Sequence, residues 1–521
     1  MPESRDYKMP AEDYDDFARL TAQESHSIEG QIAAMELVEE MISRRQTERV
    51  RTVTEELRAT GLRDEALHTA VTERVQPIAV HRMDLSEGID RPGPEGKGVR
   101  KISRWNLVVE KGDGDEDDPQ ILRVMIPAHV DTVRSGARTE LDLDMVHPDR
   151  LEGLGVYDMG AGVLNNIALA TSVNVPKGMK VFFVFTVDEE ENSIGARRLM
   201  ERQLREWPMM DIVLSSEIGP VPPLANGDQR MRLITDRAGR LKMFGDISIA
   251  PGSQGHGAEA SVANASEAMH DVIQRMKARM FEGFEDESAF SETHSRLPPE
   301  RFEHGDVHAW REPGETTGYT NQNRANFDFS ARIVPVSRKK KLAEVVGSGR
   351  VLPDDPLTQY EMFFERVMRG IGKRGQWEKY GLSGRLFRNP TRASYAPYEM
   401  PLDHPLVKIA SATLERISGV APDIVGAPSV ADENDYAYDM LQRRRNRALQ
   451  VGQPATSLTT FEGTNRGVIT IPPNGDKAHN PDEWVSKLDI MRTRDAIRSL
   501  IEDATGFAQL LGKKQELGEN F

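Results

Sequence analysis

Histidines and acidic residues follow four short apolar runs of this chain, each close to the point where the run ends. The runs are Ile121–Pro127, Val181–Val187, Ile212–Leu214 and Val468–Ile471, and after them come His129, the acids Asp188–Glu191, Glu217 and His479. If the runs are strands of a mostly parallel sheet, these side chains collect just past the carboxyl ends of the strands, where open α/β sheets place active sites. Imidazoles and carboxylates gathered there favour a divalent metal site.

A further candidate ligand, Asp158, lies in the glycine-rich segment GLGVYDMGAGV. A glycine-rich turn before a helix can cradle phosphate. This segment lacks the Gly-Lys-Ser/Thr of a nucleotide loop, and its carboxylate would repel a phosphate group. Glycines that fold the backbone tightly around one carboxylate fit a metal loop better, and the two oxygens of Asp158 could then bridge two cations.

The chain has no cysteine, so a metal site must use His and carboxylate ligands, which suit zinc, manganese or cobalt. Two histidines and three carboxylates supply ligands for about two metal ions. We expect Asp131 to accept a hydrogen bond from the far ring nitrogen of His129 and to fix its tautomer. The acids of Asp188–Glu191 would repel one another and raise some of their pKa values, which suits a general base.

Apolar runs alternate with helical patterns such as Gly162–Ser172 and Ala196–Glu206, which predicts an α/β fold with a mostly parallel sheet flanked by helices. Residues 11–60 have helical spacing up to a turn at Thr60-Gly61. A different pattern occupies residues 226–399, with strands at Lys242–Ile249 and Ala325–Ile333, and a helix at Pro405–Ser418 follows it. We therefore predict a catalytic domain in two parts, residues 1–225 and 400–521, with a smaller α+β domain, 226–399, inserted between them.

The net charge of −16 and the pI of about 5.4 argue against a nucleic-acid partner, because neutralising phosphates requires clustered Lys and Arg. The basic runs Arg338–Lys341 and Arg443–Arg447 are short and read as solvated surface. The first residues have no apolar signal-peptide core, and no stretch approaches the roughly 18 apolar residues of a membrane span. We expect a soluble, cytoplasmic protein with no membrane partner.

Taken in order along the chain, the motifs resemble those of the metallopeptidase-like amidohydrolases. The motifs are His129-x-Asp131, the glycine-rich loop of Asp158, Asp188-Glu189-Glu190 with Ser193-x-Gly195, Ser216-Glu217 and the late His479. That family includes glutamate carboxypeptidase, acetylornithine deacetylase, succinyl-diaminopimelate desuccinylase, aminoacylase and peptidase T. The resemblance runs from about residue 105 to about residue 490 and is specific as an ordered set.

The resemblance implies two divalent metal ions per subunit, zinc before manganese or cobalt. One would be held by His129, Asp158 and Glu217, and the other by Asp158, Glu190 and His479. Glu189 would be the general base and Asp131 the partner that orients His129.

The resemblance also implies a phosphorylase/hydrolase-like catalytic domain whose inserted domain is a lid that forms a homodimer. In that lid, His256 would donate to the oxyanion of the transition state. Asn264 and Arg332 match positions that bind the substrate's carboxylate or carbonyl group.

The implied reaction is hydrolysis of an amide bond in a small peptide or an N-acyl amino acid. Two alternatives stay open: hydrolysis of another C–N bond, such as deamination of a small amine, and a non-catalytic binding protein that retains the fold. The chain departs from the family at Arg134, at Gly160-Ala161 and before Arg332, and the segments Phe281–Pro313 and Gly347–Arg392 are long. The substrate therefore does not follow from the resemblance, and the acidic stretch Asp432–Asp439 fits either the cleft or a solvated helix start.

Overall fold

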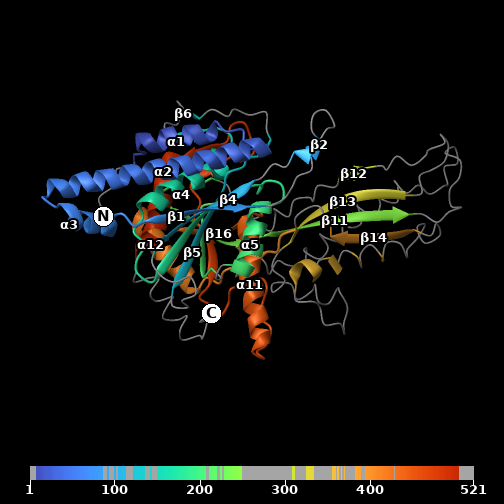
Figure 1. Cartoon of the computed structure of the whole chain (residues 1–521). Helices are drawn as coiled ribbons and strands as arrows, with labels where there is room; N and C mark the ends of the chain where they lie inside the picture. The colour runs from blue at the N-terminus through green and yellow to red at the C-terminus, as the bar shows by residue number, and fades with distance from the viewer. Residues whose placement is uncertain are drawn as a thin grey trace.

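The fold is described from a computed structural model, in which two sheets are seen as separate parts of the molecule (Figure 1). The structure describes residues 8–85, 104–112, 121–134, 149–206, 210–219, 228–248, 394–427 and 429–503, together with short stretches at 91–92, 99–100, 141–143, 223–225, 308–310, 324–333 and 382–388 and scattered residues of 355–369. Among the described residues, no helix combines the length and apolar character that crossing a membrane requires.

The larger sheet is mixed, with a parallel centre and mainly antiparallel margins. Within the described residues, eight strands follow one another across it in the order β1 (Ile78–Asp84), β4 (Trp105–Gly112), β8 (Met179–Thr186), β5 (Leu122–His129), β9 (Ile212–Ser215), β17 (Gly467–Thr470), β10 (Arg232–Arg237) and β15 (Tyr398–Glu399), and β16 (Asp423–Ala427) pairs with β10 off this path. The pairs β8–β5, β5–β9 and β9–β17 are parallel.

The four apolar runs predicted as strands are the four central strands, β8, β5, β9 and β17, and they are neighbours in the sheet. Every residue of β5 and β8 is buried, which explains why these strands read as continuous apolar runs and not as alternating ones. Because the four strands are parallel, their carboxyl ends lie at one edge. The predicted α/β class is confirmed.

Two groups of helices pack on this sheet (Figure 1). One group consists of α1 (Ala11–Thr21), α2 (Ile28–Ala59), α4 (Ala161–Ser172), α10 (Pro405–Ser418) and α12 (Lys487–Glu502), with α3 (Asp64–Arg74) against α2. The other consists of α5 (Ile194–Glu206) and α11 (Asp432–Gln450), which contact each other. Nearly all of α4 is buried, as expected for a helix that is apolar on every side.

A second sheet forms the smaller part of the molecule. Its four described strands follow the order β12 (His308–Trp310), β13 (Arg324–Ile333), β11 (Gly239–Ser248) and β14 (Ser383–Arg388), and all of its pairs are antiparallel. The predicted insertion 226–399 also includes β10 and β15, which pair in the larger sheet, so the described strands of the second sheet lie between Gly239 and Arg388. The sequence also predicts a helix over Asn264–Met280, and these residues lie outside the described part of the chain.

A small third sheet joins two segments that are far apart in the sequence. It runs β18 (Gly475–Asp476), β19 (Trp484–Ser486), β7 (Arg150–Glu152) and β6 (Asp142–Leu143). Trp484 stands opposite Glu152 in the β19–β7 pair. The sheet therefore places the segment before Asp158 beside the segment that follows His479.

The N-terminal helical region has a break that the sequence pattern did not predict. Helix α1 ends at Thr21 and α2 begins at Ile28. Ser27 caps α2, since its side-chain oxygen accepts a hydrogen bond from the backbone N–H of Gly30 at 3.0 Å. A Cβ atom at Gly30 would lie 1.9 Å from the carbonyl oxygen of Glu24, so only glycine lets the connecting turn fold back onto the helix.

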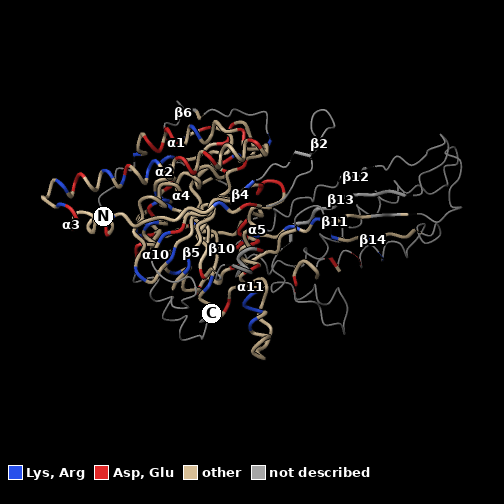
Figure 2. Tube along the Cα trace, in the orientation of Figure 1, with Lys and Arg blue, Asp and Glu red and all other residues tan. Residues whose placement is uncertain are grey.

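Charged residues of both signs alternate along α2, and basic residues cluster along the C-terminal half of α11 (Figure 2). The basic run Arg443–Arg447 lies in that half of α11. Arg443 is paired with Asp439 one turn earlier, at 2.8 Å. This agrees with the prediction that the run is helix surface.

We predict that Gly30→Ala destabilises the protein although alanine favours helix by about 1 kcal/mol. The clash with the Glu24 carbonyl should cost about 1–3 kcal/mol or more, because the backbone there cannot move freely. Thermal unfolding of Gly30→Ala should show a larger loss than Ser27→Ala, which removes the cap and costs about 1 kcal/mol. A Gly30→Ala variant more stable than the parent would contradict this account of the turn.

Candidate metal centre

Five of the predicted side chains come together in two clusters that share one residue. His129, Asp158 and Glu217 form the first, and Asp158, Glu190 and His479 form the second, with the ligand atoms of each cluster within 4.8 Å of one another. Nε2 of His129 lies 3.2 Å from Oδ1 of Asp158. Nε2 of His479 lies 3.0 Å from Oδ2 of the same carboxylate. Each oxygen of Asp158 thus faces a different histidine.

The Asp158 loop is shaped by a glycine in the left-handed region. Gly155 has a φ of 73°, and a Cβ atom there would lie 2.3 Å from the methyl group of Thr132. The loop therefore packs directly on the segment that follows His129. Gly160 N–H donates to the Gly155 carbonyl at 2.8 Å and closes the turn before α4 begins. This shape, with the carboxylate of Asp158 turned toward two histidines, fits the metal-loop role that the sequence predicts.

The first cluster is buried and its atoms are oriented from behind. Nδ1 of His129 lies 2.9 Å from the backbone carbonyl of Asp131, which leaves Nε2 to face the two carboxylates. One oxygen of Glu217 accepts the Ile218 N–H at 2.8 Å, and the other lies 3.3 Å from Nε2 of His129. Nε2 of His129 and Oε2 of Glu217 therefore face each other, 3.3 Å apart.

Asp131 supports the site in a different way from the one expected. Its backbone carbonyl is close to the far nitrogen of His129, whereas its carboxylate oxygen lies 3.7 Å from that nitrogen. The two carboxylate oxygens accept hydrogen bonds from the backbone N–H groups of Glu189 and Glu190, at 3.2 and 3.1 Å. Asp131 thus holds the turn that carries the two glutamates, in addition to standing behind His129.

The second cluster is open to solvent at His479, whereas the side chains of Asp158 and Glu190 are largely buried. The side chain of His479 is half exposed and Nε2 lies 3.0 Å from Oε2 of Glu190. The other oxygen of Glu190 is buried and has no hydrogen-bond partner among the described residues. A buried carboxylate oxygen without a hydrogen bond lowers the stability of the folded protein. A cation bound between Asp158, Glu190 and His479 would remove that loss.

The crowding of charges shifts the pKa values of these groups. Burial, reinforced by the negative charge of Asp158, raises the pKa of Glu190 and of Glu217 to about 7 each. Hydrogen bonds to Asp158 and Glu190 raise the pKa of His479 to about 11. Burial opposes ionisation of Asp158, but hydrogen bonds with both histidines hold its pKa below the usual range. Without a cation, the cluster must hold protons to relieve its negative charge.

Glu189 lies next to this cluster without belonging to either triad. Burial first, and then the charges of Glu190 and Glu217, raise its pKa well above the ordinary value. A carboxyl whose proton affinity is raised in this way is suited to take and return a proton near neutral pH. The position and electrostatics of Glu189 therefore fit the predicted base.

Glu483 is a supporting residue that sequence reasoning missed. It is fully buried. One oxygen accepts the backbone N–H groups of Tyr157 and Asp158, at 2.8 and 2.9 Å. The other accepts the N–H of His479 at 3.3 Å. One carboxylate thus ties the loop of Asp158 to the loop of His479. The only signal in the sequence was an acid four residues after His479, in a run that reads as a surface turn.

The acidic stretch at the start of α11 also reaches this region. Asp432 and Glu433 are buried, and Asp432 accepts a hydrogen bond from Thr186, the last residue of β8, at 2.9 Å. Burial raises the pKa of Asp432 to about 8. The sequence left two alternatives for this stretch, a lining of the cleft and a solvated helix start. The second is wrong for Asp432 and Glu433, because both are buried in the first turn of α11.

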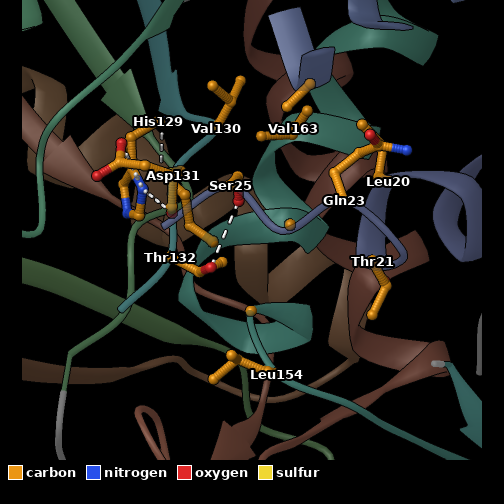
Figure 3. Close-up of a pocket in the computed structure, with 14 residues that line it drawn as sticks. Leu20, Thr21, Gln23, Ser25, His129, Val130, Asp131, Thr132, Leu154 and Val163 are labelled. Atoms are coloured by element: carbon orange, nitrogen blue, oxygen red, sulfur yellow. Dashed lines mark hydrogen bonds and ion pairs between the residues drawn. The ribbon is translucent and has the colours of Figure 1, made fainter. Parts of the chain in front are cut away.

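The N-terminal segment forms part of the wall behind His129. A cavity of about 30 Å³ is lined by residues of the α1–α2 connection, by His129 to Thr132 and by the Asp158 loop (Figure 3). Ser25 from the connection lies 3.4 Å from the hydroxyl of Thr132. Figure 3 shows this contact on the same side of the cavity as Asp131. The break between α1 and α2 thus positions a loop against the segment that carries the histidine.

The predicted lid residues are not placed by the structure. His256 and Asn264 lie outside the described residues. Arg332 lies in β13 opposite Arg240 of β11, but its side chain lies outside the described part. Their predicted roles therefore remain predictions.

We predict that Glu483→Gln weakens divalent metal binding about tenfold or more, since an amide N–H₂ would face backbone N–H donors where a carboxylate accepted them. Calorimetric titration of the metal-free protein with zinc measures the effect. Asp482→Asn is the matched control, because that carboxylate is exposed and pairs with Lys477. Equal zinc affinity in both variants would show that the hydrogen bonds of Glu483 do not contribute to metal binding.

Comparisons with known proteins agree with the geometry. Residues 125–503 match the peptidase family M20/M25/M40. Among solved structures, a tripeptidase from Staphylococcus aureus is similar with a TM-score of 0.53 and 12% identity, over 94% of this chain and 98% of that one. A metallo-carboxypeptidase of family M20 from Sulfolobus solfataricus gives a TM-score of 0.52 and 12% identity, over 95% and 99%. An aminopeptidase, PepT, from Bacillus cereus gives 0.51 and 13%, over 94% and 97%.

At these identities the solved structures show a shared fold alone. The search of curated proteins found no match to the chain. The family match covers well over half of the sequence and spans all five residues of the two clusters. The chain belongs to the peptidase family M20/M25/M40, whose members are hydrolases of amide bonds.

Proposed function

We propose that this protein hydrolyses an amide bond in a short peptide or an N-acyl amino acid, with two divalent metal ions held by the two clusters. The observation that carries the proposal is the shared carboxylate of Asp158, whose two oxygens face the two histidines at 3.2 and 3.0 Å. Such an arrangement suits two cations held close together. The similar fold of a tripeptidase, an aminopeptidase and a carboxypeptidase favours short peptides for the first tests.

The donor set fits zinc, with manganese or cobalt as alternatives. It offers two imidazole nitrogens and three carboxylates and no sulfur. We assign His129, Asp158 and Glu217 to one ion and Asp158, Glu190 and His479 to the other. The unpartnered oxygen of Glu190 and the raised pKa values of Glu190 and Glu217 support the assignment, because both indicate a negative cluster built to be neutralised.

When bound, the metal ions lower the pKa of water and polarise the carbonyl group of the substrate. The chain supplies the remaining steps. Glu189 accepts a proton from the attacking water and returns it to the leaving amine, as its raised proton affinity allows. Asp131 keeps Glu189 and Glu190 in place through their backbone N–H groups. We further propose that His256 donates to the oxyanion and that Asn264 and Arg332 bind the substrate.

Two features of the proposal concern the surroundings of the enzyme. We propose that the protein is cytoplasmic and that it forms a homodimer through the inserted domain. The dimer rests on the resemblance of the motifs to the family, and the location rests on the sequence, in which no stretch approaches the length of an apolar membrane span. Sedimentation of the purified protein measures the second directly, and a monomer at micromolar concentration would contradict it.

We predict that Glu189→Gln lowers kcat by orders of magnitude and leaves metal binding within about threefold of the parent, because the base is lost while both clusters remain. Glu191→Gln is the control, since Glu191 is an exposed acid in the same turn. Both variants are assayed for hydrolysis and titrated with zinc. A Glu189→Gln variant with substantial activity would remove Glu189 from the role of base.

The substrate class is tested with dipeptides, tripeptides and N-acyl amino acids, each in the presence of zinc, manganese or cobalt. We expect release of free amino acids that stops when a chelator removes the metal and returns when metal is restored. Ammonia as the product would instead support deamination. No hydrolysis of any compound, together with no bound metal by elemental analysis, would support a non-catalytic protein.

A further inference from the structure

A crevice of about 790 Å³ lies on the helical side of the molecule and is lined by five arginines. Its walls come from α1, α2, α3 and α12 and from the end of α4. The arginines are Arg45, Arg49, Arg74, Arg494 and Arg498. This concentration of guanidinium groups stands out in a chain whose net charge is −16.

The innermost arginines are neutralised by a buried aspartate. Asp13 of α1 is buried, and one of its oxygens lies 2.9 Å from Nη1 of Arg45. Its other oxygen pairs with Nη1 of Arg494. Arg45 also pairs with Asp16 at 2.6 Å. These ion pairs connect α1 to α2 and α12, so the helices that form the base of the crevice are held together by buried charges.

Arg49 and Arg498 are compensated less closely, since Arg498 has a carboxylate only at 3.8 Å. Among the described residues, Arg49 has no carboxylate within ion-pair distance. Burial, and then the positive charge of Arg498, lower the pKa of Arg49, and Glu502 only partly opposes them. Arg498 donates to the Ser172 hydroxyl at 2.9 Å and lies 3.8 Å from Asp495. The positive charges of Arg49 and Arg498 therefore act on each other within the lining of the crevice.

Neighbouring groups add to this positive charge. Lys111 is buried, and burial followed by the charge of Arg49 lowers its pKa to about 8. Arg494 is about 6% exposed and feels the charges of Arg45 and Arg498. Its Nη2 has no hydrogen-bond partner among the described residues, and the same holds for Nε of Arg49 and of Arg498. These three nitrogens are buried, so they contribute positive charge near the crevice and no direct contact to a ligand.

Acidic residues also line the crevice, but three of them have partners of their own. Glu12 pairs with Arg44, Glu48 with Arg51 and Glu56 with Arg74, at 2.9, 2.8 and 3.5 Å. Glu73 and Arg74 are adjacent in the sequence, and both line the crevice. The arginines left with the least compensation are those of α2 and α12, Arg49 and Arg498.

We propose that this crevice binds a small anion through carboxylate or phosphate oxygens, with Arg49 and Arg498 as its main contacts. A guanidinium group presents paired N–H donors that match two oxygens of such an anion. The hydroxyl groups of Thr52 and Ser172 line the same space. The volume lies in the range of small-molecule sites, so a carboxylated or phosphorylated metabolite fits better than a bare ion.

This site is separate from the metal centre. Helix α4 begins directly after the Asp158 loop, whereas Thr171 and Ser172, which line the crevice, stand at its other end. Twelve helical residues span about 18 Å. The proposal therefore does not depend on the catalytic one.

The metal-loaded enzyme is titrated calorimetrically with inorganic phosphate and with succinate, at constant ionic strength set with chloride. We expect saturable binding of at least one anion, and the ratio of the two affinities assigns the site to phosphate or to carboxylate. Arg49→Gln and Arg498→Gln should each weaken binding about tenfold, as expected for loss of one charged hydrogen-bond donor. Arg51→Gln is the control, because Arg51 is exposed on the same helix and pairs with Glu48.

Two results would overturn the proposal. One is the absence of saturable binding up to about 10 mM of either anion. The other is equal binding in the parent and both arginine variants, which would place the anion at the metal centre. The unfolding temperature without anion adds a second measurement. Removing one of two repelling charges should leave it unchanged or raise it, whereas a fall of several degrees in Arg49→Gln would mark Arg49 as a structural residue.

Discussion

The mutual repulsion of buried carboxylates is the constraint on which this structure depends. Asp158, Glu190 and Glu217 meet in a space from which water is largely excluded, and Glu189 lies beside them. Burial and like charge raise the pKa values of three of these four acids. A protein keeps such a cluster only where something balances the charge. Two histidines and the metal ions that we propose supply that balance, and the surrounding fold holds the acids in place.

The parallel centre of the sheet brings the cluster together. Strands β5, β8, β9 and β17 end at one edge, so His129, Glu190, Glu217 and the segment leading to His479 leave the sheet side by side. Two buried carboxylates then hold in place the turns and loops that follow the strands. Asp131 holds the turn of Glu189 and Glu190, and Glu483 holds the loops of Asp158 and His479. Backbone N–H groups are the donors in each case. These hydrogen bonds therefore do not depend on the side chains of the residues that donate them.

Five arginines gather between the helices around α2. Asp13 and Asp16 compensate Arg45 and Arg494 inside the helical layer. Arg49 and Arg498 remain near the surface with like charge facing like charge. The metal centre and the arginine-lined crevice stand at the two ends of α4, so one helix connects the two regions.

The sequence by itself determined the fold class, the central strands and the five residues of the two clusters. These could be predicted because buried parallel strands are continuous apolar runs, because four of the five residues follow strand ends and because Asp158 stands in a glycine-rich loop, so that all three signals are local. The helix at Pro405–Ser418 was equally predictable, since proline stands at its start and Gly419, with a φ of 79°, ends it.

Tertiary structure alone decided the break between α1 and α2, the membership of β10 in the larger sheet, and the supporting roles of Glu483 and Asp432. Each of these depends on partners far away in the chain: Glu483 on the Asp158 loop, Asp432 on β8, and β10 on β17. An acid near a turn has the same local pattern whether it is solvated or accepts backbone hydrogen bonds in the interior. Only the packing of distant segments separates the two, because burial turns an ordinary carboxylate into one that must find donors.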